Sequence, residues 1–167
     1  GAAAAILSAN HDRGILSTHL HTEGQYAKKL WVEAPSSKAQ PRLSPTILQD
    51  RKHFLHMDGK EVFKHAINRF PEVIIEGLNH NNLSIDDIDL LIPHQANVRI
   101  SKMIQKKLSL SDNQIISNIH KYGNTTSASI PIALNEAVID KKLNKGDILV
   151  LAAFGSGFSW GSAILKW

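Results

Sequence analysis

Ile92-Pro93-His94-Gln95-Ala96-Asn97-Val98-Arg99 joins two segments of different character. The apolar segment before it, Ile88 to Ile92, is typical of a buried strand, and the segment after it has the spacing of an amphipathic, basic helix. A strand that ends at a histidine and turns directly into a helix places that imidazole at the rim of a sheet. Because ligands of open α/β sheets bind beyond the carboxyl ends of the strands, His94 is the leading candidate for a chemically active residue.

Composition limits what the chain can be. Its 167 residues, 43% of them apolar, suffice for one ordinary globular core. No apolar run approaches the ~18 residues that a membrane span needs, and the amino end has no basic and apolar leader, so we expect a soluble, cytoplasmic protein. The absence of cysteine excludes disulfides, thiolate metal sites and a cysteine nucleophile within this chain. The net charge of +4 is compatible with a nucleic-acid partner and equally with another acidic partner.

Two helices are expected to flank the His94 strand. From Asp58 on, apolar side chains recur at three- and four-residue steps and predict a core-facing helix, which Pro71 should kink or restart. Ser84, with an acidic residue three places later, predicts a capped helical turn before the strand. After the strand, a second apolar stripe predicts a helix that is basic on its outer face. The apolar positions of the two helices are Phe63, Ala66, Ile67, Phe70, Ile74, Ala96, Ile100, Met103, Ile104 and Leu108.

The carboxyl-terminal segments continue this alternation. A short strand is expected over 114–119, followed by a polar turn over 122–127 and a third helix that holds Pro131 in its first turn. The apolar segment 148–154 predicts a strand covered on both faces, and a final antiparallel strand is expected over 158–167. The order helix, strand, helix, strand, helix, strand, strand indicates the α/β class, with helices and one mostly parallel layer of strands of the five-stranded type.

The amino-terminal part is less regular. Segments 1–7 and 15–21 predict two antiparallel strands on either side of the turn-forming residues 10–14. Three prolines follow among serines and lysines, which is typical of a surface connection and marks the best candidate boundary in the chain. They are Pro35, Pro41 and Pro45.

Three polar loops are expected at the carboxyl ends of successive parallel strands. They carry His94, Asn124 and the turn Gly155-Ser156-Gly157. A neutral imidazole offers one N–H, the Asn124 amide offers two, and a glycine-flanked turn can present main-chain N–H groups. Donors that converge on one point stabilise an oxyanion or an enolate, and removal of one such donor typically costs ~3–4 kcal/mol of barrier. This edge of the sheet is the predicted active site.

Each candidate also has a purely structural interpretation. His94 could be a strand-end histidine satisfied by the backbone, and Asn124 could be a turn residue that tolerates positive φ. The basic helix face, which includes Arg99, Lys102 and Lys106, could be only a solvated surface. His19 and His21 are two positions apart in a predicted strand and would share one of its faces. No carboxylate or cysteine lies in register with them, so we expect no metal site.

Five segments of the chain form a joint pattern. They are Gly14-Ile15-Leu16-Ser17-Thr18-His19-Leu20-His21, Met57-Asp58-Gly59-Lys60-Glu61-Val62-Phe63-Lys64, Pro93-His94-Gln95-Ala96-Asn97-Val98-Arg99-Ile100, Gly123-Asn124-Thr125-Thr126-Ser127-Ala128-Ser129-Ile130-Pro131 and Phe154-Gly155-Ser156-Gly157-Phe158-Ser159-Trp160-Gly161-Ser162-Ala163. In this order they resemble β-ketoacyl-acyl carrier protein synthase III, a thiolase-fold condensing enzyme of bacterial fatty acid synthesis. The resemblance runs from the first residue to the last.

The resemblance implies a Cys-His-Asn triad. In that mechanism an acyl group passes from acyl-CoA to the cysteine, malonyl-acyl carrier protein loses carbon dioxide, and the resulting enolate attacks the acyl-enzyme. His94 and Asn124 would hold the enolate oxygen, and the backbone N–H of Ser156 would complete the oxyanion hole of the acyl-enzyme. The resemblance implies no cofactor beyond these substrates, and family members are homodimers.

The resemblance also implies binding positions and a protein partner, the acyl carrier protein, with no nucleic acid, membrane or metal. Positions that match the coenzyme A or phosphopantetheine contacts are Gly59, Ala96, Asn97 and Phe154. Positions that match the carrier-protein surface and the basic mouth of the tunnel are Gln95, Arg99, Lys64, Lys106 and Lys107.

A complete synthase of this family has about twice this length and takes its cysteine from a half that this chain does not match. We therefore expect an acyltransferase fragment, inactive without its amino-terminal half. Residues 1–24 would be the last strands of the first half, 25–57 a connecting segment, and 58–167 the carboxyl-terminal thiolase-like half. Two alternatives stay open: a cysteine-free module that binds the carrier protein or dimerises without catalysis, and a related condensing enzyme of secondary metabolism.

Overall fold

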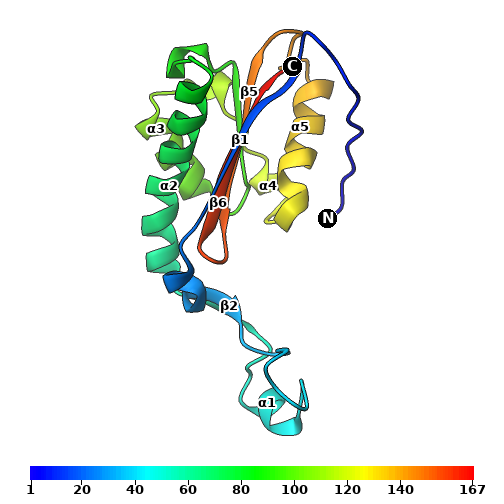
Figure 1. Cartoon of the computed structure of the whole chain (residues 1–167), viewed down its shortest axis with the longest axis vertical. Coiled ribbons are helices and arrows are strands. Elements are labelled where there is room, and N and C mark those ends of the chain that lie inside the picture. Colours follow the sequence, from blue (N-terminus) through cyan, green and yellow to red (C-terminus); the bar gives the residue numbers. More distant parts are fainter.

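The computed structural model describes residues 1–167. Helices flank a four-stranded sheet, and an arm projects from one end of this main body (Figure 1). The strands of the sheet are β1 (Gly14–Thr22), β4 (Leu90–Pro93), β5 (Ile148–Gly155) and β6 (Ser159–Lys166). The helices around it are α2 (Gly59–His80), α3 (Val98–Lys107), α4 (Ile119–Tyr122) and α5 (Ser129–Ile139). Short 3-10 helices span Gly24–Lys29, Ile85–Asp87, Asp112–Gln114 and Thr126–Ala128.

The sheet is mixed and has four strands, so the expectation of a mostly parallel layer of the five-stranded type is only partly correct. Its order is β1, β6, β5, β4. β4 and β5 pair in parallel, whereas β6 is antiparallel to both of its neighbours, β5 and β1. The reason is the short turn after β5, which folds β6 back beside β5 as a hairpin. β6 thereby lies between β5 and β1, which both run in the opposite direction.

The predicted amino-terminal strand pair is wrong. Residues 1–13 contain no strand, and β1 joins the main sheet through eight paired positions on β6. The segment Ala2 to Ala5 offers only methyl groups to a neighbouring strand, whereas β6 offers a continuous ladder and a covered face. The proposed division of the chain at residues 24 and 57 into parts of two halves stays a prediction.

The predicted strand over 114–119 is reduced to one parallel bridge between Leu91 and Ile115. The Gln95 side chain explains this reduction. Its amide nitrogen donates to the Ile116 carbonyl at 3.2 Å, and its oxygen accepts from the Asn118 N–H at 3.0 Å. A side chain thus satisfies backbone groups that a longer strand would use in its ladder.

Helix α2 crosses Pro71 without restarting, which corrects one of the two expectations for that residue. A proline inside a helix costs ~3 kcal/mol, whereas burial of a Val, Leu, Ile or Phe side chain contributes about 1.5–3 kcal/mol each. Phe70, Val73, Ile74 and Leu78 are all buried around it. Packing against the sheet therefore outweighs the lost hydrogen bond. The capped turn at Ser84, with Asp87 as its reciprocal partner, is confirmed.

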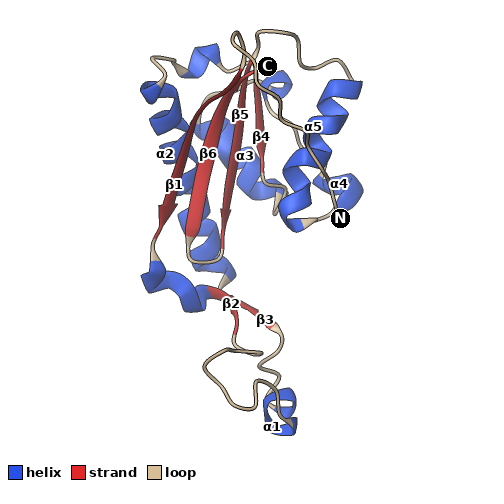
Figure 2. Ribbon diagram, turned by 45° about the vertical axis from the view of Figure 1, so that its right-hand side comes forward, coloured by secondary structure: helices blue, strands red, loops and turns tan.

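Helices lie on both faces of the sheet (Figure 2). A buried apolar layer lies on each face. The larger lies beneath α2 and α3 and includes Ile74, Ile104 and Ile164. The smaller lies beneath α5 and includes Leu90, Ile92, Ala133, Ala137 and Leu149. The expected coverage of the apolar strand 148–154 on both faces is confirmed. Both layers hold the carboxyl ends of β4 and β5 in place.

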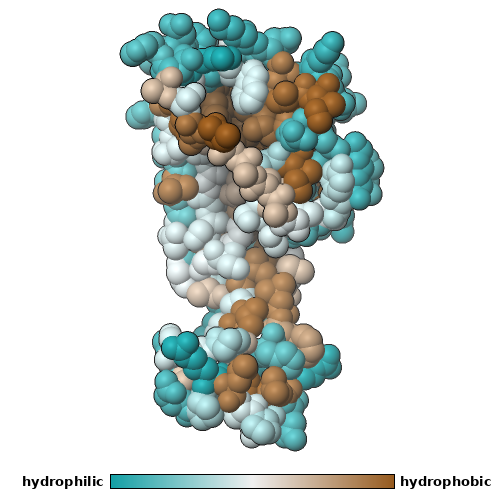
Figure 3. Space-filling model, turned by 90° about the vertical axis from the view of Figure 1, so that its right-hand side faces the viewer, coloured by the Kyte–Doolittle hydropathy of each residue, from teal (hydrophilic) through white to brown (hydrophobic).

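The proline-containing segment forms the arm, outside the main sheet (Figure 1). It holds the antiparallel pair β2 (Leu30–Val32) and β3 (Leu55–Met57) and the short helix α1 (Pro45–Gln49). Figure 3 shows apolar surface both on this arm and on one face of the main body. No helix is long and apolar enough to cross a membrane.

Candidate active site

One cavity of about 1190 Å³ lies where β4 and β5 end. Its walls come from the start of α2, the β4–α3 connection, the loop before α5, the β5–β6 turn and residues of β1 and β6. The structure brings together at this cavity all the candidates for the catalytic, oxyanion and phosphopantetheine positions. They are His94, Asn124, Ser156, Gly59, Ala96, Asn97 and Phe154. The location is as expected, and the role of each residue stays a prediction.

His94 follows β4 directly, and both its backbone and its ring are held. Its N–H donates to the Ala152 carbonyl of β5 at 2.8 Å, and its ring Nδ1 lies 2.6 Å from Ser129 Oγ. Burial lowers the pKa of His94, so the neutral imidazole is favoured. Ring Nε2 has no partner within the chain and is available to a ligand in the cavity.

Asn124 lies in the loop between α4 and α5. Gly123 before it has φ +67°, in the left-handed region that favours glycine. The Asn124 Oδ1 accepts from the Thr126 N–H at 2.8 Å, and the Nδ2 group has no partner within the chain. The Asn124 oxygen therefore serves the turn, but the positive φ angles fall on Gly123 and Thr126 and not on Asn124. Both amide N–H donors remain available to a ligand.

The β5–β6 turn contributes a main-chain donor. The backbone N–H of Ser156 makes no hydrogen bond to the rest of the chain, and its residue lines the cavity. Gly157 has φ +136°, and a Cβ at that position would lie 2.6 Å from the backbone nitrogen of Ser159. Only glycine fits there, so the glycine after Ser156 has a steric reason that is independent of any chemistry.

Gln95 corrects one expectation. The residue matched a carrier-protein contact position, but it is 1% exposed and cannot reach a partner at the surface. Its side chain donates to the Pro93 carbonyl at 2.7 Å in addition to its bonds with the 116–118 backbone. Its own N–H donates to Ser129 Oγ at 3.2 Å. Gln95 therefore ties the His94 loop to the segment that leads into the Asn124 loop.

Sequence reasoning missed two residues that extend this link. Ser129 is the first residue of α5 and contacts the His94 ring, and Glu136, two turns further along α5, holds the segment before Asn124. The Glu136 carboxylate accepts from Asn118 Nδ2 at 2.8 Å, from the Tyr122 hydroxyl at 2.7 Å and from Lys121 Nζ at 3.0 Å. For Ser129, the only signal in the sequence was a polar side chain in the first turn of the helix after the Asn124 loop. For Glu136 the sequence offered no such signal.

The same three donors make the Glu136 carboxylate sensitive to pH. Its hydrogen bond from Asn118, followed by those from Tyr122 and Lys121, lowers the pKa of Glu136 to about 2. A carboxyl whose pKa is depressed in the folded state stabilises the fold above its unfolded pKa and loses that contribution as the pH falls toward the folded pKa. The link between α4 and α5 should therefore be complete at neutral pH and be lost between about pH 4.5 and pH 2.

Replacement of Glu136 by glutamine tests this link. We expect the free energy of unfolding at pH 7 to fall by about 2 kcal/mol, because hydrogen bonds to a charged group are replaced by weaker ones at a partly screened site. The difference from the unmodified chain should shrink as the pH is lowered from 4.5 toward 2. Urea unfolding over this range measures it, with the exposed Asp86→Asn as the matched control. A difference that does not depend on pH would contradict the assignment.

The four remaining carrier-protein candidates lie on the outer surface of α2 and α3. We call them the basic patch, and all are exposed: Lys64, Arg99, Lys106 and Lys107. The Arg99 guanidinium lies 5.6 Å from the centre of the Phe63 ring, and Phe63 lines the cavity. Lys107 Nζ donates to Asn68 Oδ1 of α2 at 2.6 Å. The patch thus begins beside the cavity and follows both helices away from it.

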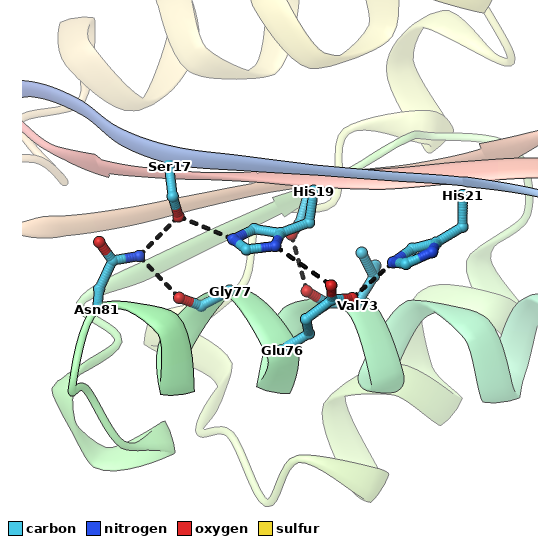
Figure 4. A network of polar contacts seen from close by, with 8 residues as sticks. Ser17, His19, His21, Val73, Glu76, Gly77 and Asn81 are labelled. Atoms are coloured by element: carbon cyan, nitrogen blue, oxygen red, sulfur yellow. Dashed lines mark hydrogen bonds and ion pairs between the residues drawn. The ribbon is translucent and has the colours of Figure 1, made fainter.

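The histidine pair on β1 has a carboxylate beside it, contrary to expectation. Figure 4 shows Glu76 of α2 between His19 and His21, at 3.3 Å from His19 Nδ1 and 2.6 Å from His21 Nε2. The hydrogen bond from His21 is the main cause that lowers the pKa of Glu76. His21 and Glu76 are 55 positions apart in the chain, so no local sequence pattern predicts their contact. The cluster joins the edge strand to α2, and the structure contains no group of three or more side chains placed to hold a metal ion.

The fold and the site define a class. A mixed sheet in this order, with histidine, asparagine and a glycine-flanked turn at one cavity, is half of a thiolase-like α/β protein. More narrowly, the chain belongs to the family of 3-oxoacyl-[acyl-carrier-protein] synthase III, C-terminal part, whose family model matches residues 78–167. It is thereby related to the acyltransferases of fatty acid biosynthesis.

Individual relatives agree with this assignment. The chain is 43% identical over 166 residues to the β-ketoacyl-[acyl-carrier-protein] synthase III of Campylobacter concisus, a match that covers 99% of this chain and 49% of that protein. The crystal structure of the synthase III of Thermus thermophilus superimposes with a TM-score of 0.84 at 34% identity and covers 96% of this chain and 48% of that one. The Aquifex aeolicus enzyme gives 0.82 at 34% identity. The chain spans about half the length of the curated relatives that it matches.

Proposed function

We propose that this chain supplies the decarboxylation and condensation part of the active site of a β-ketoacyl-acyl carrier protein synthase III. The observation that carries the proposal is the pair of unpartnered donors at one cavity, His94 Nε2 and Asn124 Nδ2. The substrates would be an acyl-CoA and malonyl-acyl carrier protein, whose phosphopantetheine arm would pass the cavity walls. The wall positions proposed for that arm are Gly59, Ala96, Asn97 and Phe154.

The donors suit the chemistry of decarboxylation. When the malonyl thioester loses carbon dioxide, the electrons of the broken C–C bond move into the thioester and place negative charge on its carbonyl oxygen. A neutral His94 and the Asn124 amide can both donate to that oxygen, and donors fixed before reaction stabilise the developing charge most effectively. Burial lowers the pKa of His94 and so favours the neutral ring that this role needs.

Condensation needs groups that this chain does not contain. The enolate carbon would attack an acyl group held as a thioester, and the chain has no cysteine to hold it. We therefore place the nucleophile in the matching amino-terminal half of the protein, and the exposed apolar surfaces of the arm and the main body are the candidate contacts for that half and for a second copy. The free N–H of Ser156 would stabilise the oxyanion of the acyl-enzyme during attack.

An acylation assay tests the proposal. The complete protein should take up label from acetyl-CoA as a thioester, release carbon dioxide from malonyl-acyl carrier protein and form a β-ketoacyl product. The isolated chain should take up no label, because it has no thiol. A complete protein that binds the carrier protein but neither decarboxylates nor condenses would refute the enzymatic proposal and favour a binding module.

Arg99→Glu should weaken binding of the acyl carrier protein by about tenfold at low salt, because charge reversal at a basic patch repels an acidic partner. The loss should shrink as ionic strength rises, since exposed charges are screened within about 10 Å at 0.1 M salt. Titration with the carrier protein at two salt concentrations measures this. Lys145→Glu, which changes the net charge equally on an exposed turn before β5, is the matched control. An equal loss of affinity in both variants would mean that net charge, and not the basic patch, determines binding of the carrier protein.

A further inference from the structure

Ser129 contacts Nδ1 of the His94 ring, whereas the other ring nitrogen, Nε2, has no partner within the chain. Its Oγ lies 2.6 Å from His94 Nδ1 and accepts the backbone N–H of Gln95 at 3.2 Å. The serine is 2% exposed, so its hydroxyl is shielded from bulk water. These are the only two hydrogen-bond partners of this hydroxyl in the structure.

The contacts of that hydroxyl decide which ring nitrogen carries the proton. A hydroxyl has one hydrogen to donate, and the Gln95 N–H already takes one of its acceptor positions. If His94 Nδ1 carried a proton, Ser129 would accept two hydrogen bonds and its own hydrogen would be buried without an acceptor, which folded proteins avoid. If Nδ1 is unprotonated, it accepts the Ser129 hydrogen and every group has a partner.

We infer that Ser129 is a positioning residue that fixes the Nε2–H tautomer of His94 and so directs an N–H donor into the cavity. The Gln95 N–H holds the hydroxyl in place, because it occupies the acceptor position on the opposite side. Ser129 is also the first residue of α5, and the amino end of a helix disfavours a positive charge beside it. The ring is thereby held neutral and in one orientation.

The tautomer of His94 is a property of the folded chain, whereas its effect on the reaction rate rests on the proposed function. An unprotonated Nε2 would present a lone pair to the thioester carbonyl and could not stabilise an enolate. A ring free to exchange tautomers would be competent only part of the time, so loss of Ser129 should lower the turnover number and leave the Michaelis constant unchanged. Ser129 borders the cavity, but its hydroxyl is engaged by His94 and Gln95 and would act on the substrate only through the His94 ring.

Nitrogen NMR of the protein labelled with 15N-histidine tests the tautomer directly, with the His94 signals assigned through their absence in His94→Gln. The expected pattern is an unprotonated Nδ1 and a protonated Nε2 at neutral pH. A protonated Nδ1 in the unmodified protein would overturn the inference, and this measurement needs no altered Ser129. In Ser129→Ala the two nitrogens should move toward averaged shifts, and an unchanged pattern would also overturn it.

Activity of the complete protein provides the second measurement. Ser129→Ala should lower the turnover number for malonyl decarboxylation by about tenfold, the value of one ordinary hydrogen bond, and shift the acid limb of the pH profile upward, because a donor to neutral imidazole is lost. Ser129→Thr, which keeps the hydroxyl, should restore both. The buried Ser101→Ala on α3 should change neither. An inactive unmodified protein whose His94 still shows the expected tautomer, lost in Ser129→Ala, would refute the proposed function and leave this inference standing.

Discussion

Asn124→Asp should lower the rate of carbon dioxide release from malonyl-acyl carrier protein by about 10²–10³-fold in the complete protein, the usual cost of one lost oxyanion donor. Aspartate keeps the oxygen that accepts the Thr126 N–H at 2.8 Å, so the loop contact survives. It loses both N–H donors and adds negative charge where the enolate charge develops. Aspartate therefore removes the donors to substrate and keeps the contact with Thr126, whereas alanine would remove both.

Two further variants complete the experiment. Asn124→Ala removes both the donors and the contact with Thr126, and its rate should fall to a similar level if donation is what matters. Asn113→Ala, at an exposed asparagine outside the cavity, should leave the rate unchanged. Carbon dioxide release from labelled malonyl-acyl carrier protein measures all three. A normal rate in Asn124→Asp, with the fold intact by unfolding measurements, would remove Asn124 from the proposed active site.

Local patterns predicted the elements that surround His94. The apolar periods located α2, α3, α5 and β5, and the spacing from Ser84 to Asp87 located a capped turn, because burial of one face and capping are determined within a few residues. The layer of strands was harder to predict. The position of β6 between β5 and β1 depends on pairings that reach from Gly14 to Lys166, and no short segment contains that information.

The residues of the candidate site likewise fall into those that the local sequence predicted and those that depend on distant contacts. His94 and the β5–β6 turn were located because they follow strands of the sheet, and chain order places such loops at one edge. Asn124 follows α4 instead, so only its motif located it. Ser129 and Glu136 were not found, because their partners lie 35 and 18 positions away along the chain. Gln95 was assigned to the surface by its neighbours in a motif, although its own burial depends on the backbone of residues 116–118. A motif identifies a loop more reliably than it identifies which side chains of that loop point outward.

Gln95→Leu should lower the free energy of unfolding of the chain by about 3 kcal/mol, because each buried polar group left without a partner costs about 1–3 kcal/mol and the added apolar burial offsets only part of this. The groups that lose their partner are the Asn118 N–H and the carbonyls of Pro93 and Ile116. Urea unfolding followed by tryptophan fluorescence measures the change. Gln105→Leu, which loses a single exposed hydrogen bond to Asp112, should cost less than about 0.5 kcal/mol.

Gln95→Glu distinguishes lost hydrogen bonds from altered packing, since glutamate has the shape of glutamine. A protonated carboxyl group can accept from the Asn118 N–H and donate to one of the two carbonyls, whereas a carboxylate would face both carbonyls with a buried charge. Burial raises the pKa of such a group, so its folded form is most stable at low pH and loses stability as the pH rises through the raised value. The variant should therefore lie close to the unmodified chain at pH 4 to 5 and well below it at pH 7. Equal destabilisation at both pH values would mean that Gln95 acts through packing alone, without a specific role in joining the His94 loop to the segment before Asn124.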